Sequence, residues 1–130
     1  MKKEKSVGMQ QFGKDHWSLL AYIECRCVDH QGYPDLVHMR CNPTTHPALA
    51  RTSVGTRTWK PEWGTRLRNG FKLPNHDDHD CADDLETTGL INHVGTRLNP
   101  RFVLTEEGYR IAAILRRFKS EGGQFADFKP

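Results

Sequence analysis

The side chains best suited to metal chemistry are concentrated in one short string, residues 76–81, which reads His-Asp-Asp-His-Asp-Cys. Imidazole nitrogen, cysteine thiolate and carboxylate oxygen are the ligands that zinc takes in proteins. His76 and His79 are three residues apart and could share one face of a helix, with Cys81 close behind them. The residues that could complete a tetrahedral set are Cys41, His38 and His46.

The same string also has a purely structural interpretation. Aspartates in the first turn of a helix are stabilised by the helix dipole, and a cysteine on its apolar face is explained by burial. Zinc sites that can be identified from sequence usually show paired ligand spacings, and Cys25 and Cys27 are too close together for the common knuckle. We therefore expect no metal and no cofactor, and keep zinc at His76, His79 and Cys81 as the alternative.

The sequence carries little sign of catalysis. It has no glycine-rich phosphate loop, nucleophile elbow or zinc-protease helix. None of its seven histidines has a serine or cysteine partner in a known arrangement. The charge of Asp80 beside Cys81 should raise the pKa of that thiol, which is unfavourable for a reactive thiolate. We expect a protein that is not an enzyme.

The composition fits one small domain. The chain has 130 residues, of which 36% are hydrophobic, and a mean hydropathy of −0.71, so its core should be modest. No run approaches the roughly 18 apolar residues of a membrane helix. The lysine-containing amino terminus lacks the apolar stretch of a secretory signal. We expect a cytoplasmic protein without membrane contact, whose four cysteines stay reduced.

Charge is distributed in two adjacent blocks of opposite sign. Residues 51–72 carry six basic side chains and one acidic one, a balance of +5, and residues 73–86 carry six acidic side chains and no base, a balance of −6. The basic segment also contains Trp59, Trp63 and Phe71. Arginines supply phosphate contacts and aromatic faces stack on bases, so this pattern is typical of nucleic-acid binding. The alternative is that the tryptophans pin a long loop while the arginines pair with the acidic block.

The amino-terminal half predicts one helix. We expect it over about residues 15–28, with Asp15 as its N-cap, after a flexible leader at 1–13. Its apolar residues at helical spacing are Trp17, Leu20, Ile23, Cys27 and Val28. A short extended run at 36–40 should form a strand.

Prolines and glycines interrupt residues 42–75, which we expect to be rich in loops, with one helical turn near 47–52. Asn69 and Gly70 predict a hairpin with a type I′ turn between residues 65–67 and 71–73.

The carboxy-terminal half gives the clearest local signals. Asn75 or Asp77 can cap a helix that Gly89 ends. Strands should follow at 91–94 and 102–104. Thr105 should then cap a final helix that ends before a tail at 120–130; the residues expected to face inward are Ile111, Leu115 and Phe118, with Ala112 and Ile114 beside them.

The stretches 83–91, Asp-Asp-Leu-Glu-Thr-Thr-Gly-Leu-Ile, and 102–109, Phe-Val-Leu-Thr-Glu-Glu-Gly-Tyr, carry a family resemblance. With the charged hairpin between them, they resemble the winged helix-turn-helix families, MarR-like regulators especially. The resemblance covers about residues 80–118. It implies an α+β winged-helix domain over residues 14–119, with a two-stranded wing and a loop-rich insertion at about 42–75 before the third helix.

This resemblance implies a nucleic-acid-associated, transcription-regulator-like protein, with duplex DNA as the first expected partner. The helix at the recognition position is strongly acidic and would be repelled by the phosphates. We therefore expect contacts from the wing and the basic loop, through Arg57, Lys60, Arg66, Arg68, Arg97 and Arg101.

The alternative is a protein-interaction module whose acidic helix binds a basic partner through Asp78, Asp83 and Glu86. Both a monomer and a homodimer formed through the terminal helices are compatible with the sequence.

Overall fold

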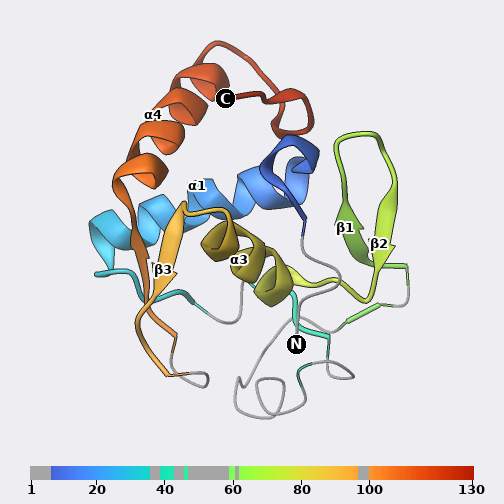
Figure 1. Cartoon of the computed structure of the whole chain (residues 1–130), viewed down its shortest axis with the longest axis horizontal. Helices are drawn as coiled ribbons and strands as arrows, with labels where there is room; N and C mark the ends of the chain where they lie inside the picture. Colours follow the sequence, from blue (N-terminus) through green and yellow to red (C-terminus); the bar gives the residue numbers. More distant parts are fainter. Residues whose placement is uncertain (1–6, 36–38, 43–45, 47–58, 61, 97–99) are drawn as a thin grey trace.

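The fold combines helices with two small sheets. The structure is a computed structural model that describes residues 7–35, 39–42, 46, 59–60, 62–96 and 100–130 (Figure 1). Within these residues the chain is mixed α+β, as expected. The elements are η1 (Met9–Gln11), α1 (Lys14–Asp29), β1 (Gly64–Arg66), β2 (Lys72–Pro74), α3 (Asp78–Thr87), β3 (Ile91–His93), β4 (Phe102–Leu104), α4 (Glu106–Ser120) and η3 (Phe125–Asp127).

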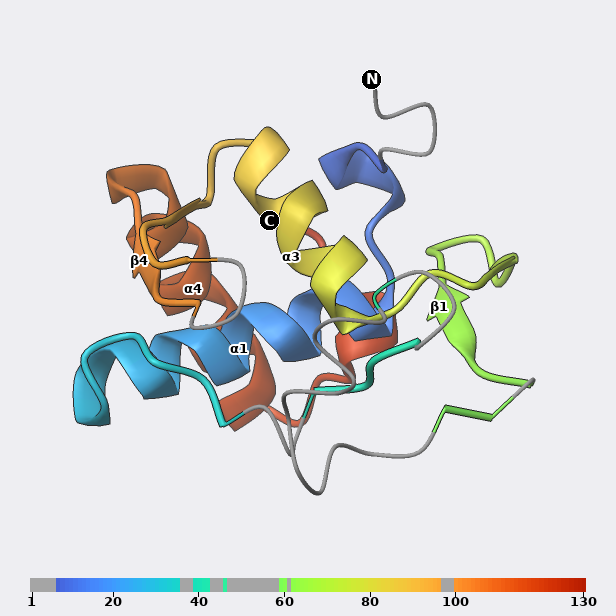
Figure 2. The same cartoon turned by 90° about the horizontal axis from the view of Figure 1, so that it is seen from below.

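Helix α1 spans the molecule and separates the two sheets. The β1–β2 hairpin lies near its amino-terminal end, and the β3–β4 hairpin lies with α4 near its other end (Figures 1 and 2). A helix of 16 residues is about 24 Å long, so side chains at its two ends belong to different surfaces.

The expected first helix is confirmed, but its cap is not Asp15. The N-cap is Gly13, and a side chain there would collide with the backbone carbonyl of Arg66, 2.0 Å from an added Cβ. The Asp15 carboxylate instead accepts a hydrogen bond of 2.8 Å from the backbone N–H of Arg66. Asp15 therefore joins α1 to β1 rather than capping its own helix.

Helix α3 begins after one of its two predicted caps, Asp77 rather than Asn75, and ends where its sequence predicts. Asp77 is the N-cap, and it forms a capping box with Asp80, in which each side chain accepts the other's backbone N–H. At the other end Gly89 has a φ of +87°, and the Leu90 N–H donates to the Leu85 carbonyl. This is the Schellman arrangement that ends many helices.

The β1–β2 hairpin is confirmed, but its turn is not type I′. Leu67 N–H donates to the Phe71 carbonyl, so the loop has three residues, Arg68 to Gly70. Of these, Gly70 alone has a positive φ, +87°. A type I′ turn needs two positive φ angles, whereas a three-residue loop needs one, which the glycine provides.

The second hairpin and the last helix follow the sequence signals. Strands β3 and β4 pair antiparallel with Ile91 opposite Leu104. Thr105 caps α4 by accepting from the Gly108 N–H. Ile111, Ala112 and Leu115 are buried and Phe118 is half-buried, while Ile114 is exposed.

Both ends of the described chain pack into the core. Val7 and Phe12, which we expected in a flexible leader, are buried, and so is Phe128 of the expected tail. Trp17 contacts the rings of both phenylalanines edge-on, with ring centres 5.2 Å from Phe12 and 4.9 Å from Phe128. The packed domain therefore extends beyond residues 14–119 in both directions.

Some expectations lie outside the described residues. These are the helical turn near 47–52 and most of the strand expected at 36–40, of which Met39 and Arg40 are described. Among the described residues, no helix combines the length and the apolar character needed to cross a membrane.

Candidate functional site

A basic–aromatic cleft lies between the amino-terminal half of α1 and the β1–β2 hairpin. Its volume is about 530 Å³. The residues that give the cleft its character are Lys14, Tyr22, Trp63, Arg66 and Lys72, and Asp15, Glu62 and the Arg40–Asp78 pair also line it. Three of these, Trp63, Arg66 and Lys72, come from the basic segment identified in the sequence.

Strand alternation places two cations side by side on the cleft. Arg66 and Lys72 are direct cross-strand partners in the hairpin, so their side chains share one face. Thr65, on the opposite face, is fully buried against the core. The Arg66 guanidinium donates to the Gly70 carbonyl at 2.9 Å, and the Lys72 ammonium donates to the Glu62 carbonyl. Neither makes an ion pair with a carboxylate of the described residues, so both charges remain available to an anion.

Aromatic rings stand beside these cations. Trp63 and Trp59 contact each other edge-on with ring centres 5.7 Å apart, and the Lys60 ammonium lies 5.8 Å from the Trp63 ring centre. Phe71, next to Lys72, is 59% exposed. A ring whose face is accessible can stack on a nucleobase, and such stacking is tolerant of sequence.

The other two cationic groups in the cleft face carboxylates. The Lys14 ammonium lies 3.3 Å from an Asp15 carboxylate oxygen, and Arg40 has a structural role. Its guanidinium donates two hydrogen bonds to Asp78, at 2.8 and 3.0 Å, and a third to the Gly64 carbonyl at 2.6 Å. Asp78 also accepts from the Arg40 backbone N–H. Arg40 therefore joins α3 to β1, and its charge is largely neutralised by Asp78.

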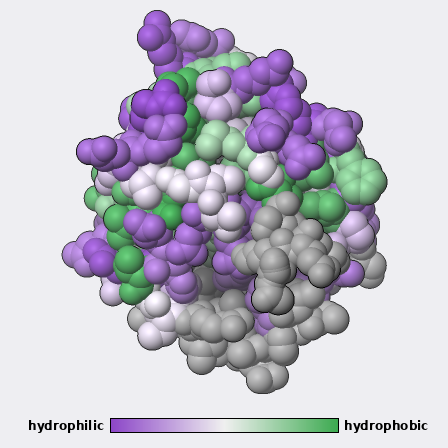
Figure 3. Space-filling view, in the orientation of Figure 1, coloured by the Kyte–Doolittle hydropathy of each residue, from purple (hydrophilic) through white to green (hydrophobic). Residues whose placement is uncertain are grey.

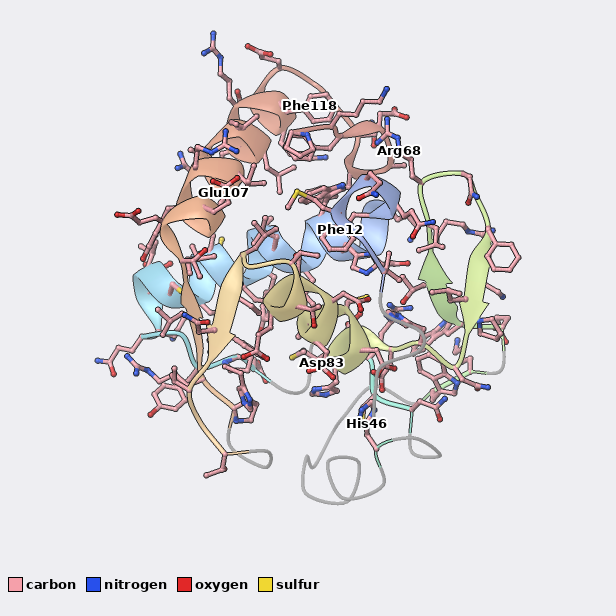
Figure 4. All side chains as sticks on the ribbon, in the orientation of Figure 1. Phe12, His46, Arg68, Asp83, Glu107 and Phe118 are labelled. Atoms are coloured by element: carbon pink, nitrogen blue, oxygen red, sulfur yellow. The ribbon has the colours of Figure 1, made fainter. Side chains whose placement is uncertain are left out.

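Of the remaining expected nucleic-acid contacts, the two described arginines, Arg68 and Arg101, lie apart from each other. Arg68 donates to the Phe128 carbonyl at 2.7 Å and points toward the carboxy-terminal segment (Figure 4). Arg101 donates to the Gln31 carbonyl and lies 5.7 Å from the Tyr33 ring centre, at the far end of α1. Arg57 and Arg97 lie outside the described residues.

The alternative interpretation, in which the basic segment pairs with the acidic helix, is not seen at Arg66 or Arg68, since both side chains donate to backbone carbonyls. Polar side chains also dominate the upper part of the face drawn in Figure 3, over α4 and the carboxy-terminal segment.

The three carboxylates of the alternative hypothesis differ in their surroundings. Asp78 is held by Arg40. Asp83 and Glu86 are exposed on α3, and Glu86 accepts from the His93 backbone N–H at 3.2 Å. Only Asp83 and Glu86 are therefore presented outward.

A buried carboxylate, Asp84, organises the interior between α1 and α3. It accepts from His16 at 2.9 Å, from His76 at 3.0 Å and from the Val7 backbone N–H at 3.2 Å. His16 and Asp84 are at most 2% exposed. Burial lowers the pKa of His16, although Asp84 opposes this shift. Burial alone would raise the pKa of Asp84, but the hydrogen bonds from His16 and His76 outweigh it and lower that pKa.

Asp84 and His16 were missed as a pair because 68 residues separate them. A signal was nevertheless present. Asp84 falls on the apolar face of its helix, between Cys81 and Leu85, and a carboxylate there needs a buried partner.

The network extends from His76 to Cys81. His76 Nδ1 lies 2.7 Å from the Thr65 hydroxyl and 3.8 Å from Cys81 Sγ. The order of carboxylate, imidazole and thiol is that of a nucleophilic triad, but Cys81 is fully buried, and burial raises the pKa of its thiol well above the ordinary value. No substrate can reach a group in this position, so the arrangement supports a structural role.

His76 and His79, expected to share a helix face, are separated in the fold. His76 precedes α3 and points into the core, whereas the ring of His79 lies 5.6 Å from that of His46. The combination of His76, His79 and Cys81 is therefore not brought together as one site.

The buried network predicts a loss of stability in mild acid. Because the native pKa of His16 is below 6.5, the unfolded state binds a proton that the native state does not as the pH falls through 6.5. The free energy of unfolding should then decrease with falling pH, by at most about 1.4 kcal/mol per pH unit for this one proton. Asp84 adds a further loss below its ordinary pKa of 3.8.

Urea unfolding of the wild type and of His16→Gln between pH 7.5 and 5 would measure this effect. Glutamine can still donate to Asp84 but does not titrate. Asp15 and His76, the other titratable groups near His16, are present in both proteins. His46, whose raised pKa makes stability increase rather than decrease with falling pH, is also present in both. The variant should lose less stability on acidification. Equal slopes of the unfolding free energy against pH in the two proteins would contradict the role given to His16.

None of the comparisons with protein-family models, curated proteins and solved structures gave a match for this chain.

Proposed function

We propose that this domain is a winged-helix protein that associates with nucleic acid by holding a single-stranded segment in the basic–aromatic cleft. The observation that carries the proposal is the adjacent placement of Arg66 and Lys72, without ion-pair partners among the described residues, beside the Trp63 ring. Cations of this kind bind phosphate, and an aromatic ring next to them binds the attached base.

The dimensions of the cleft support a single strand over a duplex. A volume of about 530 Å³ lies in the range of pockets that enclose one small molecule, and it would accept one nucleotide of a strand. A duplex presents paired bases whose faces are stacked inside the helix, so Trp63 could not stack on them without base flipping. The cleft thus favours a partner other than the duplex expected from the family resemblance.

The winged-helix part of the proposal rests on the order of elements. Helix α3 is followed by the β3–β4 hairpin and then by α4, and the hairpin corresponds to the expected wing. In this arrangement α3 occupies the recognition position. Its outward-facing Asp83 and Glu86 would meet the phosphates of a major groove with the same sign of charge.

Binding of single strands and of a duplex can be compared directly. We expect a labelled oligonucleotide of about 12 nucleotides to bind the wild-type protein at low salt more tightly than the corresponding duplex does, because base faces are accessible only in the single strand. Gel mobility or fluorescence anisotropy would measure both affinities, with the oligonucleotide alone and an unrelated acidic protein as controls. Tighter binding of the duplex would contradict the cleft assignment, and no binding of either would contradict the function.

A second candidate function is recognition of a basic protein segment by α3. It is favoured by the exposure of Asp83 and Glu86 on one helix, and Asp78 takes no part because Arg40 already holds it. A pull-down with the wild type and with Asp83→Lys and Glu86→Lys combined would test it. A partner retained by the wild type and lost by this variant would support this function, and a partner retained by both would contradict it.

A further inference from the structure

The unpaired positive charge of the basic–aromatic cleft is concentrated in one pair of neighbouring side chains. Arg66 and Lys72 are directly opposite each other in the β1–β2 hairpin, so their Cβ atoms are about 4.5–5.5 Å apart on the same face. The two other cationic groups that line the cleft, Lys14 and Arg40, already face carboxylates. One anion can therefore contact both unpaired charges at once.

The rest of the cleft wall carries carboxylates. Asp15 and Asp78 bind the cations of the neighbouring wall, and Glu62 is exposed, with no ion pair to any cation that the structure describes. A strand that ran through the whole cleft would bring further phosphates up to these carboxylates, and like charges repel. The cleft therefore provides for one phosphate group rather than for a row of them.

Two adjacent cations match the charge of a terminal phosphate. A phosphate inside a strand is a diester with a charge of about −1, whereas a terminal phosphomonoester carries about −1.5 to −2 at pH 7 and three strong acceptor oxygens. Arg66 donates one N–H group to the Gly70 carbonyl, and Lys72 donates one to the Glu62 carbonyl. These bonds hold both side chains in place and leave their other N–H groups for the phosphate oxygens.

The size of the cleft also fits the end of a strand. Its volume of about 530 Å³ is that of a pocket for one small molecule, so it encloses about one nucleotide. Trp63 lines the same cleft and provides a ring against which the base of that nucleotide can stack. A terminal nucleotide needs only one exit for the rest of its strand, whereas an internal nucleotide needs two.

We infer that the cleft binds the phosphorylated end of a single strand, with Arg66 and Lys72 on the terminal phosphate and Trp63 against the base of the same nucleotide. The inference rests on the proposed function, because it specifies which part of a nucleic acid enters the cleft. A 5′-phosphate and a 3′-phosphate present the same charge and oxygens, so the ligand chemistry is the terminal phosphomonoester.

Strands that differ only at their ends would test the inference. Fluorescence anisotropy would compare three strands of about 12 nucleotides, labelled on an internal base, with a 5′-phosphate, a 3′-phosphate or no terminal phosphate. We expect one phosphorylated strand to bind the wild type at least about tenfold more tightly than the unphosphorylated one, because the second cation gains a charged partner. The strand that binds more tightly identifies the end.

A fourth strand controls for total charge. A strand about two nucleotides longer, without a terminal phosphate, has about the same total charge as the phosphorylated strand. It should bind about as weakly as the unphosphorylated strand, because its added charges are diesters outside the cleft. If it bound as tightly as the phosphorylated strand, total charge would explain the difference and the inference would be overturned.

Variants of the two cations test the contacts themselves. Arg66→Gln and Lys72→Gln should each reduce the preference for the phosphorylated strand to less than about threefold, while glutamine still donates to the backbone carbonyl that holds the side chain. The matched control is Arg117→Gln on α4, where the side chain is 83% exposed, and this variant should keep the preference. Circular dichroism of each variant establishes that it is folded.

The outcomes separate this inference from the proposed function. Equal affinities for the three shorter strands would overturn the inference while single-strand binding itself stood. A preference that both Arg66→Gln and Lys72→Gln retained would also overturn it. No binding of any strand would overturn the proposed function and, with it, the inference.

Discussion

Replacement of Asp84 by alanine is expected to lower the free energy of unfolding by about 3–5 kcal/mol, because each buried donor left without an acceptor costs about 1–3 kcal/mol. His16, His76 and the Val7 backbone N–H would each lose an acceptor in a place that water does not reach. Domains of this size are usually stable by about 5–15 kcal/mol, so this one change should take the protein to the edge of folding.

Urea unfolding followed by circular dichroism would measure the difference, and the neighbouring carboxylate provides a control. Asp83 is the residue before Asp84 in α3 but is exposed. Asp83→Ala should therefore change stability by no more than about 0.5 kcal/mol. If the two variants were equally stable, Asp84 would not hold the interior together in the way described.

Reversal of two cleft charges, Arg66→Glu with Lys72→Glu, is expected to weaken single-strand binding roughly 100-fold at low salt. Each charge-assisted hydrogen bond to a phosphate contributes about 1.5 kcal/mol or more, and a factor of ten corresponds to about 1.4 kcal/mol. Both side chains reach the surface and bind only backbone carbonyls among the described residues, so the fold should tolerate the change.

The control for this variant changes the net charge by the same amount at another part of the surface. Arg110 and Arg117 lie on the exposed face of α4 and pair with exposed glutamates. Arg110→Glu with Arg117→Glu should weaken binding only through long-range repulsion, which falls off within about 10 Å at 0.1 M salt. Equal losses in the two double variants would mean that net charge, rather than the cleft, determines binding.

The parts of the fold that the sequence predicted are those decided by neighbouring residues. The cap of α3 at Asp77, one of two predicted candidates, the end of α3 at Gly89 and the cap of α4 at Thr105 each depend on a few adjacent positions. Their physical causes, orphan N–H groups and a positive φ, act locally, so the boundaries of α3 and α4 could be predicted without knowledge of the tertiary structure.

The errors arose where a distant residue decided the outcome. Asp15 is a residue type that often serves as an N-cap. The actual N-cap is position 13, where the carbonyl of Arg66 approaches so closely that only a glycine fits. Val7 and Phe12 look like part of a polar leader, yet Trp17 and the α1–α3 interior provide a place to bury them. Local composition contains no information about these contacts.

The candidate sites illustrate the same limit. The basic segment and its tryptophans were recognised in the sequence. Which arginine lines the cleft depends on the three-residue loop, which turns Arg68 toward Phe128 and leaves Arg66 in the cleft. Lys14 and Tyr22 enter the cleft from a helix about 50 residues away in the sequence. His46 was considered as a metal ligand in the sequence, whereas Asp77, to which it is hydrogen-bonded, was interpreted only as a helix cap.

The most direct test of the cleft is the salt dependence of single-strand binding. Affinity for a 12-nucleotide strand would be measured by fluorescence anisotropy across a salt series, for the wild type and for Arg66→Glu with Lys72→Glu. Each phosphate contact contributes about 0.7 to the slope of log affinity against log salt for single strands. The cleft assignment predicts that the variant loses about 1.4 from the magnitude of that slope, and two parallel lines would contradict it.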